Sequence, residues 1–94
     1  MFLSPRPLDA QVALLIGDVD ALVAAGALTH GQGNALESKL DAARRDLARG
    51  DLQKARDDLN AFIKQVEGLV KNGRLTPEQG NALIEEARAI LGQI

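Results

Sequence analysis

Residues 22–36 read LVAAGALTHGQGNAL, and residues 69–83 read LVKNGRLTPEQGNAL. The two stretches start 47 residues apart, and ten of their fifteen positions are identical. Each contains the end of one apolar helical stripe, a glycine, a Leu-Thr pair and the start of a second stripe, which predicts a helical hairpin. The identical positions are Leu22/Leu69, Val23/Val70, Gly26/Gly73, Leu28/Leu75, Thr29/Thr76, Gln32/Gln79, Gly33/Gly80, Asn34/Asn81, Ala35/Ala82 and Leu36/Leu83.

The residues shared by the two stretches indicate how each hairpin turns. Gly26 and Gly73 stand at the end of a stripe, where a left-handed residue closes a helix. Thr29 and Thr76 are each followed three residues later by Gln, the pattern of a capping box at the start of the next helix. The chain is therefore expected to contain two duplicated helical hairpins.

The Gly33-Asn34 and Gly80-Asn81 pairs are unusual because both residue types are poor helix formers. We interpret them as places where a neighbouring helix approaches closely at Gly, while Asn bonds to the backbone of the facing turn. Two equivalent polar pockets for a ligand or ion are the alternative. Neither pair resembles a phosphate-binding loop, since neither follows a strand or precedes a Lys-Ser/Thr step.

Outward from the repeat, apolar residues recur at steps of four and three, which is one stripe of an α-helix. The predicted helices run from about Pro7 to Ala25, from the Thr29 cap to Gly50, from the Asp51 cap to Asn72-Gly73, and from the Thr76 cap to Ile94. Their stripes are Leu8, Val12, Leu15, Val19 and Leu22; Leu36, Leu40, Ala43 and Leu47; Leu52, Ala55, Leu59, Phe62, Val66 and Leu69; and Leu83, Ala87, Ile90 and Ile94.

The lengths and connections of these helices determine the expected fold. No segment alternates with a period of two, so no strand is predicted. Helices joined by turns of a few residues pack as antiparallel neighbours, and the four-three spacing favours crossing angles near ~20°. We predict an all-α fold, an antiparallel up-down four-helix bundle in one domain, with hairpins at about 7–49 and 51–94.

Composition excludes several classes of site. The 94 residues include no Cys, Trp or Tyr, two Phe and one His, which excludes thiolate, disulfide and multi-histidine zinc chemistry. The net charge of −2 gives no electrostatic basis for binding nucleic acid. The longest apolar run, residues 12–16, is too short for membrane insertion, and the N-terminus lacks the regions of a signal peptide. No catalytic, cofactor-binding or metal-binding residue is predicted.

The charged residues do not suggest an active site. Asp18 and Asp20 lack the glycine and bidentate Glu of a calcium loop, and the adjacent pairs Asp57-Asp58 and Glu85-Glu86 diverge by about 100° around a helix. His30 is expected to be exposed in the first turn of its helix. A salt-bridged surface, rather than a DNA-binding one, is expected where basic and acidic residues alternate: Arg44, Arg45, Asp46, Arg49, Asp51, Lys54, Arg56, Asp57 and Asp58.

The first helix has a second face that its core stripe does not explain. Opposite the stripe, the helix carries small residues and one Leu with no charge, and the helix contains no basic residue. A small-residue face lets another helix approach closely, and Phe2 and Leu3 add apolar surface. A solvent-tolerant Ala-rich helix is the alternative. The possible interface consists of Ala10, Ala13, Leu14, Gly17, Ala21 and Ala24.

The chain resembles the FIMAH-like helical modules that are appended to bacterial secreted and cell-surface proteins. The resemblance covers about residues 10–92 and rests mainly on residues of the expected core and on residues that begin or end the helices. A departure is Asp51 after Gly50, where those modules usually have Asn. The matching positions are Leu36, Lys39, Leu40, Ala43, Leu47, Gly50, Ala55, Leu59, Phe62, Ile63, Val66, Leu75, Gln79, Leu83, Ile84 and Ala87.

The resemblance implies an extracellular or cell-surface location within a larger protein and a non-catalytic accessory role in protein or cell-surface association. It supplies no binding residues. A free-standing bundle that dimerises through the first helix, and an engineered binding scaffold, remain as alternatives. The expected partner is a protein or a second copy of the chain, and no enzyme activity is expected.

Overall fold

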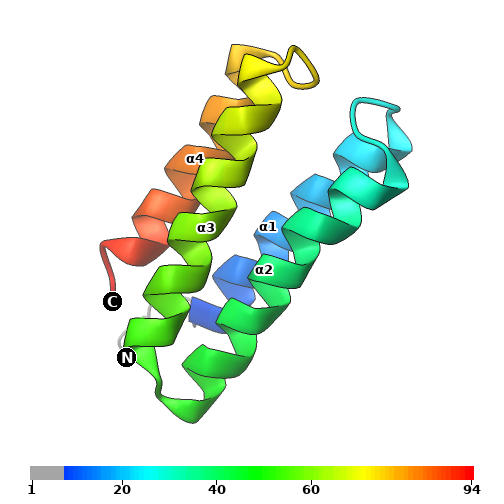
Figure 1. Ribbon diagram of the computed structural model, residues 1–94. Coiled ribbons are helices and arrows are strands. Elements are labelled where there is room, and N and C mark those ends of the chain that lie inside the picture. Colours follow the sequence, from blue (N-terminus) through cyan, green and yellow to red (C-terminus); the bar gives the residue numbers. More distant parts are fainter. Residues whose placement is uncertain (1–7) are drawn as a thin grey trace, which may run out of the picture.

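The computed structural model describes residues 8–94. They form four helices: α1 (Leu8–Ala24), α2 (His30–Arg49), α3 (Leu52–Lys71) and α4 (Pro77–Leu91). Helices that follow one another in the chain are in contact, and α1 also contacts α4, which closes the bundle. The α1–α2 and α3–α4 turns lie at one end and the α2–α3 turn lies at the other (Figure 1). The all-α four-helix fold is confirmed.

The helix boundaries agree with the prediction except at the two ends of the chain. The predicted start at Pro7 and the apolar residues Phe2 and Leu3 lie outside the described residues. The last helix ends at Leu91 rather than at Ile94, because Gly92 caps it. Ile94 nevertheless packs against the core from beyond the helix.

Both predicted capping boxes are present with the same geometry. The Thr29 hydroxyl accepts a hydrogen bond from the backbone N–H of Gln32 at 3.1 Å, and the Gln32 side chain accepts one from the Thr29 N–H at 3.0 Å. The corresponding distances between Thr76 and Gln79 are also 3.1 and 3.0 Å. These bonds satisfy backbone donors at the helix start that have no partner within the helix.

The turn glycines have the predicted left-handed conformation. Gly26 has φ 81° and Gly73 has φ 77°, and Gly50 between the two hairpins has φ 78°. At both hairpin turns the residue after the glycine donates its N–H to a carbonyl five residues earlier, at 2.9 Å: Ala27 to Leu22 and Arg74 to Leu69. The next residues, Leu28 and Leu75, are buried beneath these turns.

The core is a single apolar cluster that runs the length of the bundle. Phe62 is its largest fully buried side chain. The predicted stripes supply most of it, but Leu52 does not belong to it: this side chain is 44% exposed. Leu52 is the first residue of α3, at the end of the bundle, where no further turn covers it. The residues with no exposed surface are Val12, Leu15, Val19, Leu36, Leu40, Ala43, Ala55, Leu59, Phe62, Val66 and Ala87.

Gly33 and Gly80 are buried where two helices meet. A Cβ added to Gly33 would overlap Cγ2 of Val23, and one added to Gly80 would overlap Cγ2 of Val70. The predicted close approach at Gly is therefore confirmed. The prediction for the asparagines is wrong: Asn34 and its counterpart in α4 are exposed. Their place in the helix turns them toward solvent rather than toward the facing turn.

Candidate interaction surface

The outer face of α1 combines small residues with an exposed Leu14. The Leu14 side chain is 52% exposed, and Gly17, Ala21 and Ala24 are also exposed, while Ala10 and Ala13 are half-buried. The structure thus places all six residues of the predicted interface on one side of α1, away from the buried Val12, Leu15 and Val19. Their role in binding stays a prediction.

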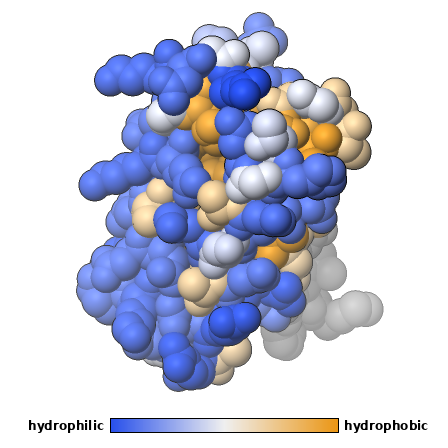
Figure 2. All heavy atoms as spheres, turned by 45° about the vertical axis from the view of Figure 1, so that its right-hand side comes forward, coloured by the Kyte–Doolittle hydropathy of each residue, from blue (hydrophilic) through white to orange (hydrophobic). Residues whose placement is uncertain are grey.

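This face differs from the surface of the other helices. α1 contains Asp9, Asp18 and Asp20 and no basic residue, whereas the exposed surfaces of α2 and α3 mix acidic and basic side chains. The face of the molecule shown in Figure 2 is mostly hydrophilic, with small hydrophobic patches between the polar side chains. Among residues 8–94, the large hydrophobic side chains that are exposed are Leu14 and Leu52. Leu14 is therefore an unusual feature of the described surface.

Between α1 and α4 the surface is hollowed into a groove of about 280 Å³. Leu14 and Gln11 form its α1 side, and Glu86, Ala89 and Ile90 form its α4 side. Ile90 is 1% exposed, so it contributes the apolar floor. Near the end of the groove, the Gln11 and Gln93 amides exchange two hydrogen bonds, of 3.1 and 2.8 Å, across the helix boundary.

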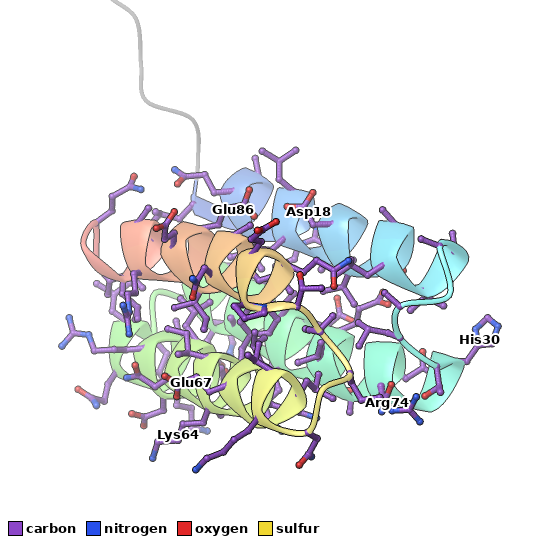
Figure 3. All side chains as sticks on the ribbon, turned by 90° about the horizontal axis from the view of Figure 1, so that it is seen from above. Asp18, His30, Lys64, Glu67, Arg74 and Glu86 are labelled. Carbon is purple, nitrogen blue, oxygen red and sulfur yellow. The ribbon has the colours of Figure 1, made fainter. Side chains whose placement is uncertain are left out.

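Two carboxyl groups meet along this groove. Figure 3 shows Asp18 on α1 and Glu86 on α4 lying side by side at the boundary between the two helices. Partial burial, followed by a hydrogen bond with the Asp18 carboxyl and by its charge, raises the pKa of Glu86 to about 7. At neutral pH the pair therefore holds a proton for a large part of the time.

A second carboxyl pair lies on the opposite edge of α1. Glu37 of α2 faces Asp20, and the pKa of Glu37 is raised by burial first, then by a hydrogen bond with Asp20 and by the charges of Asp20 and Asp41. The uncharged face of α1 is thus bordered by acidic groups on both sides, toward α4 and toward α2.

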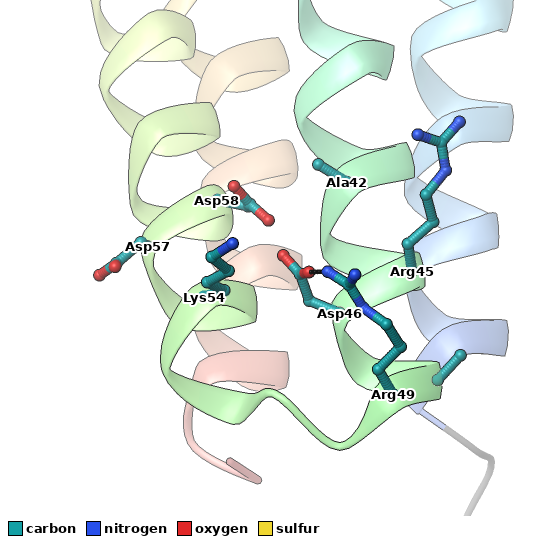
Figure 4. A pocket seen from close by; sticks show the side chains of 8 residues that line it. Ala42, Arg45, Asp46, Arg49, Lys54, Asp57 and Asp58 are labelled. Atoms are coloured by element: carbon teal, nitrogen blue, oxygen red, sulfur yellow. Dashed lines mark hydrogen bonds and ion pairs between the residues drawn. The ribbon is translucent and has the colours of Figure 1, made fainter.

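A third pair joins α2 to α3 near their shared turn. Asp46 is only 5% exposed, and Figure 4 shows its carboxyl directed toward Asp58, while Arg49 pairs with Asp46 from the same helix. The Asp58 Oδ2 atom is buried and accepts no hydrogen bond. Burial, and then a hydrogen bond with Asp46, raise the pKa of Asp58 to about 6, whereas the Asp58 hydrogen bond and Arg49 lower the pKa of Asp46. A proton on the Asp58 carboxyl accounts for this arrangement, because it lets Asp58 donate to Asp46.

The predicted salt-bridged surface around the α2–α3 turn is confirmed for one pair of residues and not for the others. Within residues 8–94 one ion pair is present, between Arg49 and Asp46. Arg44, Arg45 and Arg56 are exposed and have no ion-pair partner among residues 8–94. Lys54 lies beside Asp58 (Figure 4), and its charge acts on the Asp46 and Asp58 carboxyl groups without a direct ion pair. The buried acid, Asp46, turns toward another acid because the α2 and α3 backbones bring those two positions together.

Reasoning from sequence missed all three carboxyl pairs. Each pair takes one member from each of two helices, so spacing along one helix carries no sign of it. The adjacent residues Asp57-Asp58 and Glu85-Glu86 do diverge as predicted, and one member of each finds a partner on another helix. His30 is exposed and points away from the bundle (Figure 3), as predicted. The described residues contain no cluster of three His, Cys, Asp or Glu suited to a metal ion.

Comparison with known families gives one match. A family model described as the FIMAH domain matches residues 12–92, which include parts of all four helices. Curated proteins and solved structures gave no match. None of the helices in residues 8–94 has the length and apolar character needed to span a bilayer.

Proposed function

Because the chain belongs to the FIMAH domain family, we propose that it is a non-catalytic accessory module of a bacterial secreted or surface protein. In this proposal it mediates protein–protein or cell-surface association through the outer face of α1. The family is one of helical domains, and the resemblance described above gives the expectation of an extracellular setting. The binding face is argued from the residues of α1 itself.

The observation that carries the proposal is the exposure of Leu14. Its side chain is 52% exposed in the middle of a regular helix, beside a groove with an apolar floor. Burying a leucine side chain contributes about 1.5–3 kcal/mol. Because Leu14 is about half exposed, a partner that covers it gains roughly half of this contribution. An aliphatic anchor at a groove is a common centre of a protein interface.

Gly17 supports the same face. This glycine lies one turn from Leu14, is exposed, and has open space where a Cβ would be. A glycine inside a helix destabilises it by roughly 0.5–1 kcal/mol relative to alanine. At Gly33 and Gly80 that cost is offset by close packing against a valine of the neighbouring helix. Gly17 makes no such contact within the chain. A partner helix that approaches closely at Gly17 would give this residue the same role.

The arrangement of polar groups favours binding over chemistry. The three carboxyl pairs lie along helix boundaries, and His30 is exposed at a turn away from all of them. A general acid or base needs a substrate site within hydrogen-bond reach. The groove beside Glu86 is lined mainly by apolar atoms, which suits docking of a side chain.

The test is a binding measurement against defined partners. The chain is immobilised and exposed to purified domains encoded in the same or the adjacent reading frames, and to isolated cell-wall material. We expect binding that is weakened at least about tenfold by Leu14→Asp, since a charge in a desolvated contact costs more than 1.4 kcal/mol. Leu52→Asp, at the other exposed leucine, is the matched control and is expected to bind as the native chain does.

Two outcomes would contradict this proposal. If the Leu14→Asp and Leu52→Asp variants bind equally well, the outer face of α1 is not the binding surface. If the native chain binds none of these partners, the accessory role is contradicted. Sedimentation velocity over a range of concentrations tests the alternative of a free-standing homodimer. A Leu14-dependent dimer in the native chain would replace the accessory role with self-association.

A further inference from the structure

The groove between α1 and α4 has a chemistry that points to a kind of partner. Its floor and one wall are apolar, formed by Ile90, Ala89 and Leu14. Its edge is acidic, formed by Asp18 and Glu86. A helix that lies along such a groove presents an apolar residue inward and a charged residue toward the edge, which is the arrangement of an amphipathic helix in a hydrophobic groove.

The acidic edge has no cation of its own. α1 carries no basic residue between Leu8 and Ala24. The nearest basic residue on α4, Arg88, lines a different hollow, which it shares with Lys64 and Glu67 of α3. The one ion pair of residues 8–94 joins Arg49 to Asp46, a member of the acid pair between α2 and α3. The Asp18–Glu86 pair therefore repels itself unless a proton or an external cation lies between the two groups.

A second copy of the chain is a poor occupant of this groove. A twofold dimer through α1 brings the same surface of both copies together. Both copies would bring an acidic Asp18–Glu86 edge into that interface, and α1 has no basic residue to face it. An interface with charges of one sign on both sides is weakened. Charge complementarity instead favours a different chain that carries Lys or Arg.

We propose that the α1–α4 groove binds a basic amphipathic helix of a partner protein, an inference that rests on the proposed function. An apolar side chain of that helix packs on Ile90 and beside Leu14. A Lys or Arg side chain, one helical turn away, lies between the carboxylates of Asp18 and Glu86. The contact is a charge-assisted hydrogen bond next to a small apolar anchor.

Protonation of Glu86 provides a readout that simple apolar contact would not give. The pKa of Glu86 is raised to about 7, and a cation beside it lowers that pKa, so binding releases a proton. The groups that face Glu86 from α1 are Asp18 and the uncharged Gln11 and Leu14. Glu85 on α4 is exposed. Affinity for a cationic partner is therefore expected to rise as pH increases from 6 to 8.

The experiment uses two synthetic 18-residue amphipathic helices as probes, one built of Leu and Lys and one with Lys replaced by Glu. Binding to the full chain is followed by titration and by amide chemical-shift mapping. We expect the Leu/Lys peptide to bind, to shift amides of α1 and α4, and to bind up to about tenfold more tightly at pH 8 than at pH 6. The Leu/Glu peptide is expected not to bind.

Matched variants separate the groove from general attraction between charges. Glu86→Gln and Leu14→Ala are each expected to weaken the Leu/Lys peptide at least about fivefold, and Glu86→Gln is expected to remove the pH dependence. Glu85→Gln removes the same charge one residue away, and Leu52→Ala shortens the other exposed leucine. Both controls are expected to bind as the native chain does. Circular dichroism verifies that every variant is folded.

Several results would overturn the inference: shifts confined to α2 and α3, equal losses in Glu86→Gln and Glu85→Gln, or binding of the Leu/Glu peptide. These results leave the proposed function standing if a natural partner still depends on Leu14. Conversely, the peptide could bind as expected while no natural partner binds in a Leu14-dependent way. That result would contradict the accessory role but not the proposed chemistry of the groove.

Discussion

Gly33 and Gly80 show how one atom determines the distance between two helices. Each faces a valine of the preceding helix, and the Cγ2 of that valine occupies the place where a Cβ would be. Packed interiors adjust poorly to added methyl groups. At these two positions the low helix propensity of glycine is therefore offset by contact between the helices.

This contact leads to a prediction at the residue scale. Gly33→Ala is expected to lower the free energy of unfolding by about 1–3 kcal/mol, because the new Cβ overlaps Val23. Gly17→Ala, where a Cβ meets nothing, is the matched control and is expected to raise it by roughly 0.5–1 kcal/mol. Urea unfolding followed by circular dichroism measures both values.

A double substitution separates overlap from other effects of the new methyl group. Val23→Ala removes the atom that a Cβ on Gly33 would meet, so Gly33→Ala should cost less in its presence. If Gly33→Ala is as harmless as Gly17→Ala, or if the two substitutions at Gly33 and Val23 simply add, the close contact is not what requires glycine there.

Pairs of acids across helix boundaries are the unexpected feature at the scale of the elements. Asp18–Glu86 joins α1 to α4, Asp20–Glu37 joins α1 to α2, and Asp46–Asp58 joins α2 to α3. Paired carboxyl groups of this kind share a proton more readily than they ionise together. Three of the helix contacts are therefore sensitive to pH.

The sign of the pH dependence follows from the direction of the pKa shifts. The folded-state pKa values of Glu86 and Asp58 are about 7 and about 6, above ordinary values of 4.5 and 3.8. The folded chain binds these protons more tightly, so this contribution to stability is complete below those ordinary values and is lost as pH rises through 6 and 7. The lowered pKa of Asp46 acts in the opposite sense, and only as pH falls below its ordinary 3.8.

We therefore expect the chain to unfold at a higher temperature at pH 5 than at pH 8. Since Glu86 is exposed and Asp58 half-buried, solvent screening limits each contribution to about 1 kcal/mol or less. For a domain of this size that corresponds to a few degrees in Tm. Thermal unfolding measured at several pH values and at constant ionic strength gives the comparison, and a Tm that rises steadily from pH 5 to pH 8 would contradict it.

Neutral side chains should reproduce the effect of the proton. At pH 8, Asp58→Asn is expected to raise the Tm by a few degrees, because its neutral amide can donate a hydrogen bond to the Asp46 carboxylate without adding a second charge. Asp57→Asn, the exposed neighbour, is the control and is expected to change the Tm little. At pH 5 the difference between the two variants should shrink, since Asp58 itself is then protonated.

At the scale of the whole molecule, sequence predicted the fold better than the surface. The period of the apolar residues, the turn glycines and the Thr-Gln capping boxes are local signals, and the structure contains each of them. The prediction that Leu52 belongs to the core was wrong because the apolar pattern of one helix does not show where the bundle ends. The acid pairs were not predicted because they depend on which turn of one helix faces which turn of the next.

The candidate surface divides in the same way. The uncharged character of the outer face of α1 could be read from residues 8–24 alone, and the exposure of Leu14 agrees with it. The groove could not be predicted from that segment, because Ala89 and Ile90 of α4 complete it. A helical wheel describes one helix, whereas a docking site between two helices requires knowledge of their relative rotation.

Gly50 connects two halves that each have a complete turn of their own, and this has a consequence for how copies of the chain can combine. Its φ of 78° reverses the chain between α2 and α3. In Gly50→Val that conformation is strongly disfavoured, and a straightened junction would merge α2 and α3 into one long helix. The first hairpin of one molecule could then pack with the second hairpin of another. We expect Gly50→Val to form a hairpin-exchanged dimer, detectable by sedimentation velocity and absent in Gly92→Ala, so that one left-handed residue keeps the bundle within a single chain.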